Sequence, residues 1–312
     1  MMKLFNYKLL TSFFIALVAI LLFTGCEKED TTSATILAEN INSKITARPE
    51  LSIFQAALKK TRIDIFTKGG GPFTVWAPTN TAFAGIGINA EADLNTLDSN
   101  ILVQILTYHI QAVSRSYNEI PLGPNANMTT QGGLVQYASR KNGGTAYING
   151  AAVTEPNIQA SNGYMHVINK VLVPPFFNMA ASLALLPNYK LMLQAITKTA
   201  TVTTTNPLTI FAVPNSVMVG AGFDSTTIAN AAGANLTTLT AVIRYHIVNR
   251  RIFSPDFTAG LLKTVQGGDL AISTGTSITV KGNGNAAPFQ VTSGDFITTT
   301  GVIHGINGLL RP

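Results

Sequence analysis

Cysteine and tryptophan are almost missing from this chain, and charged residues are few. The 312 residues include one Cys, one Trp and four His, and only 12% of them are charged. A single cysteine excludes any disulfide within the chain. The formal net charge is only +6, and no Lys/Arg-rich run or basic segment interleaved with aromatics occurs. We therefore expect no nucleic acid among the partners.

The sequence motifs typical of enzymes and nucleotide-binding proteins are also missing. Neither Gly-x-Ser-x-Gly nor His-Glu-x-x-His occurs. The glycine run at residues 69–71 is followed by a strand pattern instead of Gly-Lys-Ser/Thr and a helix. The histidines lie far apart in the sequence, unlike the closely spaced ligands of most metal sites. We expect no catalytic residue, no cofactor and no metal; the least favoured alternative is a hydrolase whose fold brings a Ser or Thr to His246 or His304.

The four histidines form two matched pairs, which indicate a tandem duplication. His166 follows His109 at almost the same distance along the chain as His304 follows His246. The first histidine of each pair stands in the tripeptide Tyr-His-Ile. Two further segments recur with one common offset: Gln-Gly-Gly at 131–133 and 266–268, and Phe-Thr-Val-Trp-Ala at 73–77 against Leu-Thr-Ile-Phe-Ala at 208–212. A repeat of this length is a domain-sized unit that can bury its own core.

The N-terminal segment is typical of an exported lipoprotein. Lys3 and Lys8 precede an unbroken apolar run, Phe13–Phe23, which is too short to span a membrane and suits a signal peptide. The run ends in Phe-Thr-Gly-Cys, which resembles a lipobox. We therefore predict a signal peptide over residues 1–25 and lipidation of Cys26; the alternative is a buried free thiol.

Residues 26–33 are expected to be a tether between the lipid and the first domain. The acidic stretch Glu-Lys-Glu-Asp after the cysteine resembles the export signal of surface lipoproteins, although a solvated linker would look the same. The expected location is the outer membrane, lipid-anchored and exposed on the cell surface. The alternative is attachment on the periplasmic face.

Each repeat begins with a helical pattern and ends in strands. Pro49 is followed by Leu51, Phe54 and Leu58, which form one apolar helix face, and a strand pattern and the expected helix cap Asn80 come next. The last third of each repeat reads as short strands between Gly/Asn turns: 134–138, 146–149 and 165–173, then 270–273, 277–281 and 302–310. This order predicts an α+β class with a largely antiparallel sheet system.

The domain plan follows from the repeat. We place one domain at residues 34–175 and the other at 176–312. They join at Pro174-Pro175, a short and stiff connection that favours a fixed arrangement. The second domain carries eight basic and four acidic residues.

Three ordered segments make each repeat similar to a fasciclin-like domain. In the first repeat these are Thr-Val-Trp-Ala-Pro-Thr-Asn-Thr-Ala-Phe at 74–83, Tyr-His at 108–109 and Asn-Gly-Tyr-Met-His-Val-Ile-Asn-Lys-Val-Leu-Val-Pro at 162–174. The second repeat departs in places, because its proline comes one position late at Pro214, Met218 replaces the phenylalanine and Thr300 replaces the asparagine. The resemblance covers about residues 34–312.

The resemblance implies a compact wedge or sandwich of β-strands flanked by helices, in a non-catalytic extracellular protein of adhesion and cell-surface contact. It also implies a contact role for the Tyr-His region, here Tyr108 and His109, and Tyr245 and His246. The alternative for these four residues is burial with hydrogen bonding, because each pair lies beside an apolar run.

Two binding functions are therefore favoured over the hydrolase alternative. The first is adhesion or extracellular ligand binding, with an extracellular protein, matrix or polysaccharide as partner and membrane contact through the lipid anchor only. The second is glycan or polymer capture as an accessory lipoprotein of a nutrient-uptake system, which suits a polar, weakly charged surface. Against it, sugar sites favour exposed aromatics, and the only tryptophan, Trp76, lies in an expected core strand.

Overall fold

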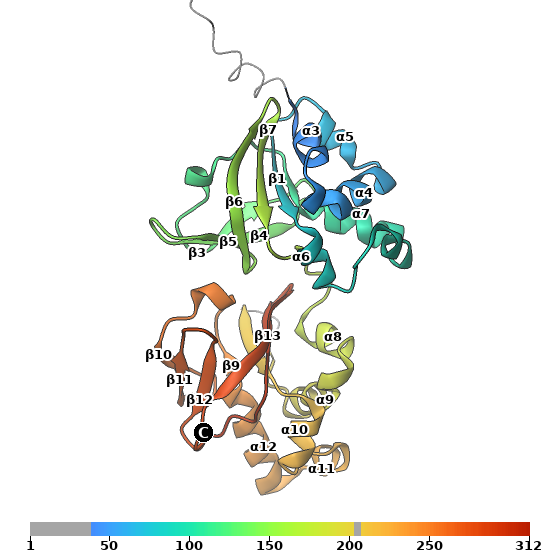
Figure 1. The fold of residues 1–312 in the computed structure, drawn as a ribbon. Helices are drawn as coiled ribbons and strands as arrows, with labels where there is room; N and C mark the ends of the chain where they lie inside the picture. Colours follow the sequence, from blue (N-terminus) through green and yellow to red (C-terminus); the bar gives the residue numbers. More distant parts are fainter. Residues whose placement is uncertain (1–38, 203–206) are drawn as a thin grey trace, which may run out of the picture.

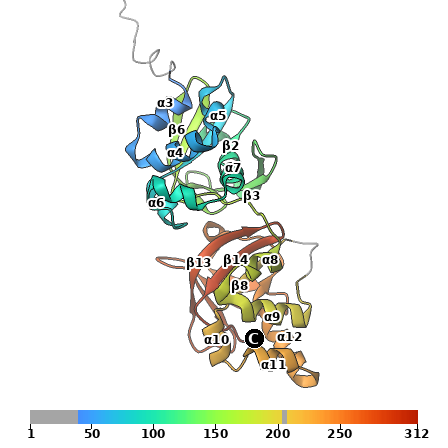
Figure 2. The ribbon, with the colours of Figure 1, turned by 90° about the vertical axis from the view of Figure 1, so that its right-hand side faces the viewer.

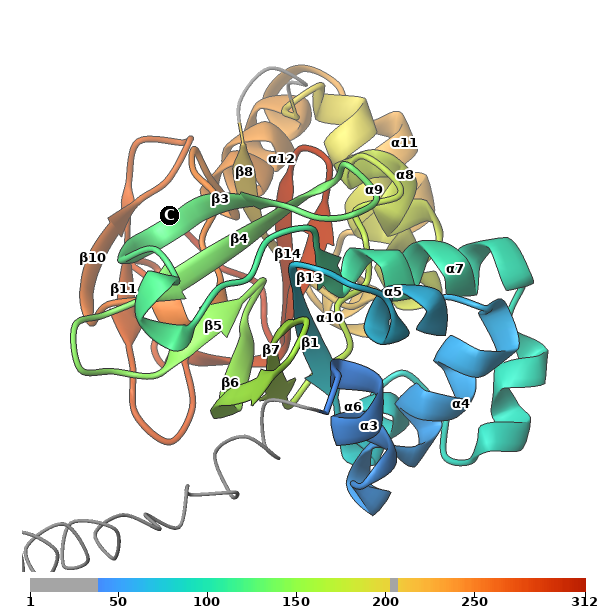
Figure 3. The ribbon, with the colours of Figure 1, turned by 90° about the horizontal axis from the view of Figure 1, so that it is seen from above.

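The computed structural model describes residues 39–202 and 207–312, so the predicted signal peptide, Cys26 and the predicted tether lie outside the described residues. The chain forms two domains, one above the other in Figure 1. Seen from above, the helices of both domains lie toward one side and strands β3–β5 and β10–β11 toward the other (Figure 3). No helix in the described part of the chain combines the length and apolar character needed to cross a bilayer.

The first domain places its main helices before most of its strands. Its helices are α3 (Ile41–Thr46), η1 (Pro49–Leu51), α4 (Ser52–Thr61), α5 (Asp64–Lys68), α6 (Asn80–Ala84), η2 (Glu91–Thr96), α7 (Ser99–Tyr108) and η3 (Tyr117–Glu119). Its strands are β1 (Phe73–Pro78), β2 (Ile110–Gln111), β3 (Gly123–Thr129), β4 (Val135–Arg140), β5 (Ala146–Ile148), β6 (Ala151–Ala160) and β7 (Gly163–Ile168).

The second domain repeats this order. Its helices are α8 (Met179–Ala184), η4 (Pro187–Tyr189), α9 (Lys190–Thr199), α10 (Asn215–Gly220), α11 (Ser225–Asn230), α12 (Gly233–Tyr245) and η5 (Ser254–Asp256). Its strands are β8 (Leu208–Ala212), β9 (Ile247–Val248), β10 (Gly260–Lys263), β11 (Asp269–Ser273), β12 (Thr279–Gly282), β13 (Phe289–Thr298) and β14 (Gly301–Ile306).

Each domain contains one seven-stranded sheet with the same topology. The orders are β2-β1-β7-β6-β5-β4-β3 and, read from the other edge, β10-β11-β12-β13-β14-β8-β9. The first and last strands pair in parallel, β1 with β7 and β8 with β14, and the remaining pairs are antiparallel. The expected α+β class with two tandem β wedges flanked by helices is confirmed.

Helix α4 shows how the apolar pattern of the sequence becomes core. Leu51, Phe54 and Leu58 are all but completely buried, as expected. Asn80 was expected to cap its own helix, and this is wrong: Thr79 caps α6. The side chain of Asn80 reaches back to the first turn of α4, because its Oδ1 accepts the Ile53 N–H at 3.0 Å.

The second domain uses the same link between helices. Asn215 Oδ1 accepts the Leu191 N–H at 3.0 Å, and its Nδ2 donates to the Pro187 carbonyl at 2.9 Å. An asparagine after each first strand therefore ties the following helix to the start of the preceding one.

Two long strands, β6 and β13, were not expected from the sequence. β6 contains Pro156 and Asn157, which favour turns in isolation. The pairing register with β7 shifts twice along β6, and Asn157 takes a positive φ of 61°. β13 shows the same two shifts against β14, with φ of 66° at Asp295. These β-bulges explain why no simple alternation marks either strand.

The two domains contact each other directly through strands β3 and β4 of the first and the region around β13 of the second. Figure 2 shows β3 on the side of the first domain that faces β13 and β14. The Arg251 guanidinium lies 4.0 Å from the ring centroid of Tyr137, whose ring also packs near Phe253. Lys170 Nζ forms an ion pair with Asp295 Oδ2 at 2.8 Å, and only 2% of the Asp295 side chain is exposed.

Two hydrogen bonds support this interface. Ser139 Oγ donates to Asp256 Oδ2 at 2.8 Å, and Asn125 Nδ2 donates to the Arg251 carbonyl at 3.0 Å. The interface thus combines an apolar ring, charge and hydrogen bonding, which adds to the stiffness expected of the Pro174-Pro175 join.

Candidate functional site

The first Tyr-His pair lies inside the first domain, where α7 passes into β2. Tyr108 is 1% exposed and His109 is 0% exposed. The Leu172 N–H donates to His109 Nε2 at 2.9 Å, so the ring proton is on Nδ1, which donates to the Ile105 carbonyl at 2.8 Å. Burial lowers the pKa of His109 to about 4 and keeps the ring neutral.

The second pair repeats this arrangement in the second domain. Tyr245 and His246 are both fully buried. His246 Nε2 accepts the Leu310 N–H at 2.9 Å, and its Nδ1–H donates to the Val242 carbonyl at 2.8 Å. Burial again lowers the pKa of this histidine to about 4. Each ring therefore joins the end of the helix that precedes it to the segment that closes the domain.

The tyrosine hydroxyls are also used within the fold. Tyr108 donates to the Val135 carbonyl at 2.8 Å and accepts from Asn149 Nδ2 at 2.8 Å. Tyr245 donates to the Asp269 carbonyl at 2.5 Å. A ligand does not reach these side chains in this conformation, so the geometry supports the structural alternative. A contact role for Tyr108, His109, Tyr245 and His246 stays a prediction.

The closing histidines, His166 and His304, anchor the β-bulges. His166 Nε2–H donates to the Arg115 carbonyl at 2.9 Å, and its Nδ1 accepts the Asn157 N–H at 3.3 Å. His304 Nε2–H donates to the Ile252 carbonyl at 2.8 Å. Burial lowers the pKa of both histidines.

Each of the four imidazoles is therefore neutral, with both ring nitrogens paired to the backbone. None offers a free nitrogen to a proton, a metal ion or a nucleophile in this conformation. Across residues 39–202 and 207–312, no group of three or more His, Cys, Asp and Glu is placed to hold a metal ion.

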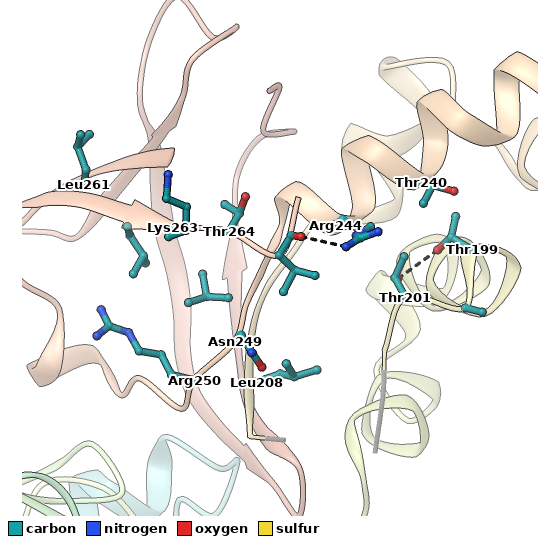
Figure 4. Close-up of a pocket in the computed structure, with 14 residues that line it drawn as sticks. Thr199, Thr201, Leu208, Thr240, Arg244, Asn249, Arg250, Leu261, Lys263 and Thr264 are labelled. Atoms are coloured by element: carbon teal, nitrogen blue, oxygen red, sulfur yellow. Dashed lines mark hydrogen bonds between the residues drawn. The ribbon is translucent and has the colours of Figure 1, made fainter. Parts of the chain in front are cut away.

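An open cleft on the second domain is the feature that sequence reasoning missed (Figure 4). Its volume is about 890 Å³, and it lies between the C-terminal ends of α9 and α12, the segment after β9, and strand β10. Arg250 and Lys263 lie toward one end in Figure 4, and Arg244, Thr199 and Thr201 toward the other. Among the described residues that line it, none is Asp, Glu or aromatic.

The cations of the cleft come from three separate elements. Arg244 is in the last turn of α12, Arg250 follows β9, and Lys263 ends β10. These three are separated by many other residues in the sequence, so no unbroken basic run marks the cleft. A position-by-position alignment of the two repeats could have revealed these three cations, because the first repeat has neutral residues at the same places.

Comparison with known proteins identifies the family of both halves. The family described as "Fasciclin domain" matches residues 49–174 and 187–312. Protein sll1483 of Synechocystis is 31% identical over 144 residues, which are 46% of this chain and 78% of that protein. The cell surface glycolipoprotein MPB83 of Mycobacterium bovis is 31% identical over 131 residues, 41% of this chain and 57% of that protein.

Two further similarities extend over both domains. The transforming growth factor-beta-induced protein ig-h3 of Sus scrofa is 25% identical over 253 residues, 78% of this chain but only 35% of that protein. A solved FAS1 domain pair from the insect cell adhesion molecule Fasciclin I is 17% identical with a TM-score of 0.40, covering 84% of this chain and 96% of that one. The last likeness is too weak to carry a conclusion. Because the two matched segments account for most of the sequence, the chain belongs to the fasciclin domain family and carries two such domains in tandem.

Proposed function

We propose that this protein is a non-catalytic cell-surface lipoprotein that mediates adhesion or binds an extracellular ligand through its two fasciclin domains. The observation that carries the proposal is the presence of two complete copies of the domain in one chain. The relative named a cell surface glycolipoprotein supports a surface location. The expected partners are an extracellular protein, a matrix or a polysaccharide, and the membrane is contacted through the lipid on Cys26.

The use of the histidines supports binding in preference to catalysis. General acid–base and nucleophilic catalysis need a side chain that reaches the substrate with a free proton donor or acceptor. His109, His166, His246 and His304 are the residues with the pKa range most suited to that work. All four instead hold the closing strand or the bulges to the rest of the domain.

Two modules in a fixed arrangement suit a polymeric or surface-bound ligand. A second domain that binds the same ligand does so at a high effective concentration, so avidity exceeds the affinity of either domain. The contacts around Tyr137 and Asp295 support a fixed spacing between the domains. Anchoring many copies of the protein to one membrane would let several copies bind the same polymer or surface, which raises the avidity further.

Protease shaving of intact cells tests the surface location. We expect digestion of both domains without lysis in the wild type. In Cys26→Ala, which removes the lipid attachment residue, we expect the protein to be lost from the cell surface. A cell-adhesion assay with the same two strains then connects location to function. Protection of the wild type until the outer membrane is opened would overturn the surface proposal and favour envelope binding or uptake.

A further inference from the structure

We propose that the cleft of the second domain, bordered by Arg244, Arg250 and Lys263, binds an acidic polysaccharide through its carboxylate groups. This deepens the proposed function by naming a ligand class, and it rests on that function for its cell-surface setting. If the alternative function, glycan capture, is the correct one, this cleft is the proposed binding site for the glycan.

The first support is uncompensated positive charge. The ion pairs found among residues 39–202 and 207–312 include neither Arg244 nor Arg250. Within the described part of the chain, the acceptor found for Arg244 is the Val265 carbonyl, at 3.1 Å, and Arg250 is exposed. Lys263 is partly neutralised, because its Nζ lies 2.9 Å from Asp269 Oδ1.

The other acids of the second domain are engaged elsewhere. Asp224 accepts the Thr227 N–H at the start of α11, at 2.7 Å. Asp256 and Asp295 bond Ser139 and Lys170 of the first domain. None of these three carboxylates lines the cleft. Asp269 beside Lys263 is therefore the one acid of the second domain near the three cations, and the net positive charge attracts anions.

The second support comes from the other domain of the same chain. The hydrogen bond from Thr209 Oγ1 to the Arg250 carbonyl, at 2.7 Å, corresponds to that from Thr74 Oγ1 to the Val113 carbonyl, at 2.6 Å. Position 250 is thus Val113 in the first domain, which is also exposed. Folding does not require an arginine there.

The remaining two cations also have neutral counterparts. Arg244 precedes Tyr245 as Thr107 precedes Tyr108. Lys263 ends β10 as Thr129 ends β3. Three positions that carry neutral residues in the first domain therefore carry cations around one cleft in the second, although the two domains share the same backbone topology.

The third support is the character of the lining. The hydroxyls of Thr199 and Thr240 donate to carbonyls of their own helices, both at 2.7 Å, so they can accept hydrogen bonds from sugar hydroxyls. The amide of Asn249 can both donate and accept. Arginine guanidinium groups bind carboxylates in a bidentate manner, which a neutral sugar does not offer. The volume of about 890 Å³ is in the range of small-ligand sites and accommodates a few sugar units of a longer chain.

The lack of aromatic side chains in the described lining favours an acidic polysaccharide over a neutral sugar or a single-stranded nucleic acid. Neutral sugars are usually held by stacking on aromatic rings, and single-stranded nucleic acid by base stacking. Neither finds a stacking partner here, since the lining found within residues 39–202 and 207–312 contains no Phe, Tyr, Trp or His. The exposed side chain of Leu261, 75% accessible, instead offers an aliphatic surface to the C–H face of a sugar ring.

Calorimetry of the full-length protein purified in detergent tests the proposal with hexagalacturonate as the probe. We expect saturable binding that weakens as salt rises, because exposed ion pairs are screened. The triple variant Arg244→Thr, Arg250→Val and Lys263→Thr, which installs the residues of the first domain, should bind about tenfold or more weakly.

A matched control removes the same net charge elsewhere. Lys59→Thr, Lys141→Thr and Lys190→Thr together should leave the affinity for hexagalacturonate within about twofold of the wild type, because these three lysines are exposed and none of them lines the cleft. Circular dichroism should show that both triple variants keep the fold. Equal losses in the two variants would overturn a specific site and leave only general attraction by charge.

Neutral and nucleic-acid probes complete the test. Maltohexaose should not bind, and a twelve-nucleotide oligothymidine should not compete with hexagalacturonate. Competition by the oligonucleotide, or no binding of hexagalacturonate at all, would overturn the inference. Either result leaves shaving and adhesion unaffected, so failure of this inference is distinguishable from failure of the proposed function.

Discussion

At the scale of single residues, histidine in this protein is a structural connector. A neutral imidazole offers one donor and one acceptor, and His109 uses both to join a helix end to a distant backbone amide. A lysine or arginine could only donate, and a leucine would leave two buried backbone groups unpaired. This explains why the only four histidines recur at equivalent places in both domains.

His109→Ala should lower the free energy of unfolding by about 1–3 kcal/mol, because it leaves the Leu172 N–H and the Ile105 carbonyl without partners inside the core. Denaturant unfolding of the variant measures this. Unchanged stability with a loss of adhesion would instead support a contact role for the Tyr-His pair. No effect on either property would contradict both interpretations.

Stability should fall as the pH drops from 6.5 toward 4. The pKa of His109 and of His246 is about 4 in the folded state against an ordinary value of 6.5. Between these values the unfolded chain binds protons that the folded chain does not, so stability is full above pH 6.5 and decreases below it. The loss is on the order of 3 kcal/mol for each histidine.

Unfolding curves at pH 7, 5.5 and 4.5 would check this expectation. His109→Gln and His246→Gln, made singly, should each show a shallower decrease than the wild type, because a glutamine amide does not titrate. A pH dependence identical to that of the wild type in both variants would contradict the assignment to these histidines.

At the scale of elements, the last strand of each domain lies very close to the first strand at the start of the parallel pairs β1–β7 and β8–β14. Gly163 and Gly301 open the last strand of each domain, with φ of 139° and 155°. A Cβ at either position would overlap a backbone carbonyl of the neighbouring strand, that of Phe73 or of Leu208. The two glycines therefore allow the closing strand to approach the first strand.

Gly163→Ala should cost more than about 3 kcal/mol, because backbone cannot move aside as a flexible side chain can. Gly143→Ala is a suitable control, since Gly143 also has a positive φ, 69°, but an added Cβ meets nothing within 4 Å. The control should cost only about 1 kcal/mol. Thermal melting compares the two variants, and equal losses would mean that φ alone, and not the close approach of strands, governs this position.

At the scale of the whole molecule, a small set of polar and aromatic contacts joins the two domains. These contacts come from Tyr137 and Lys170 on one side and Arg251, Phe253 and Asp295 on the other. We expect them to couple the unfolding of the two domains, because the cation–π contact and the ion pair are lost when either domain unfolds.

Tyr137→Ala should weaken the coupling between the domains by about 2 kcal/mol, because it removes both the ring under Arg251 and the packing on Phe253. Scanning calorimetry should then resolve two transitions where the wild type shows one. Tyr147→Ala, on the neighbouring strand β5, is the matched control and should leave the transitions joined. Separate transitions in the wild type would show that the interface couples the domains too weakly to matter.

The sequence alone determined the tandem repeat, the α+β class and the family resemblance of this protein. Repeated residues such as the histidine pairs survive in the one-dimensional order, and the apolar spacing of Leu51, Phe54 and Leu58 follows directly from helix geometry. These features depend on neighbours in the chain, so reading the chain is sufficient to find them.

Only the tertiary structure determined which polar side chains are buried and which residues they contact. The sequence left open whether Tyr108 and His109 are buried, and it assigned Asn80 to the wrong helix, because hydrogen-bond partners far away in the chain leave no local pattern. β6 and β13 were missed because their bulges are held by His166 and His304, which follow them in the sequence. The cleft of Arg244, Arg250 and Lys263 exists only where a helix end, a strand end and a loop converge, and folding alone brings those three charges together.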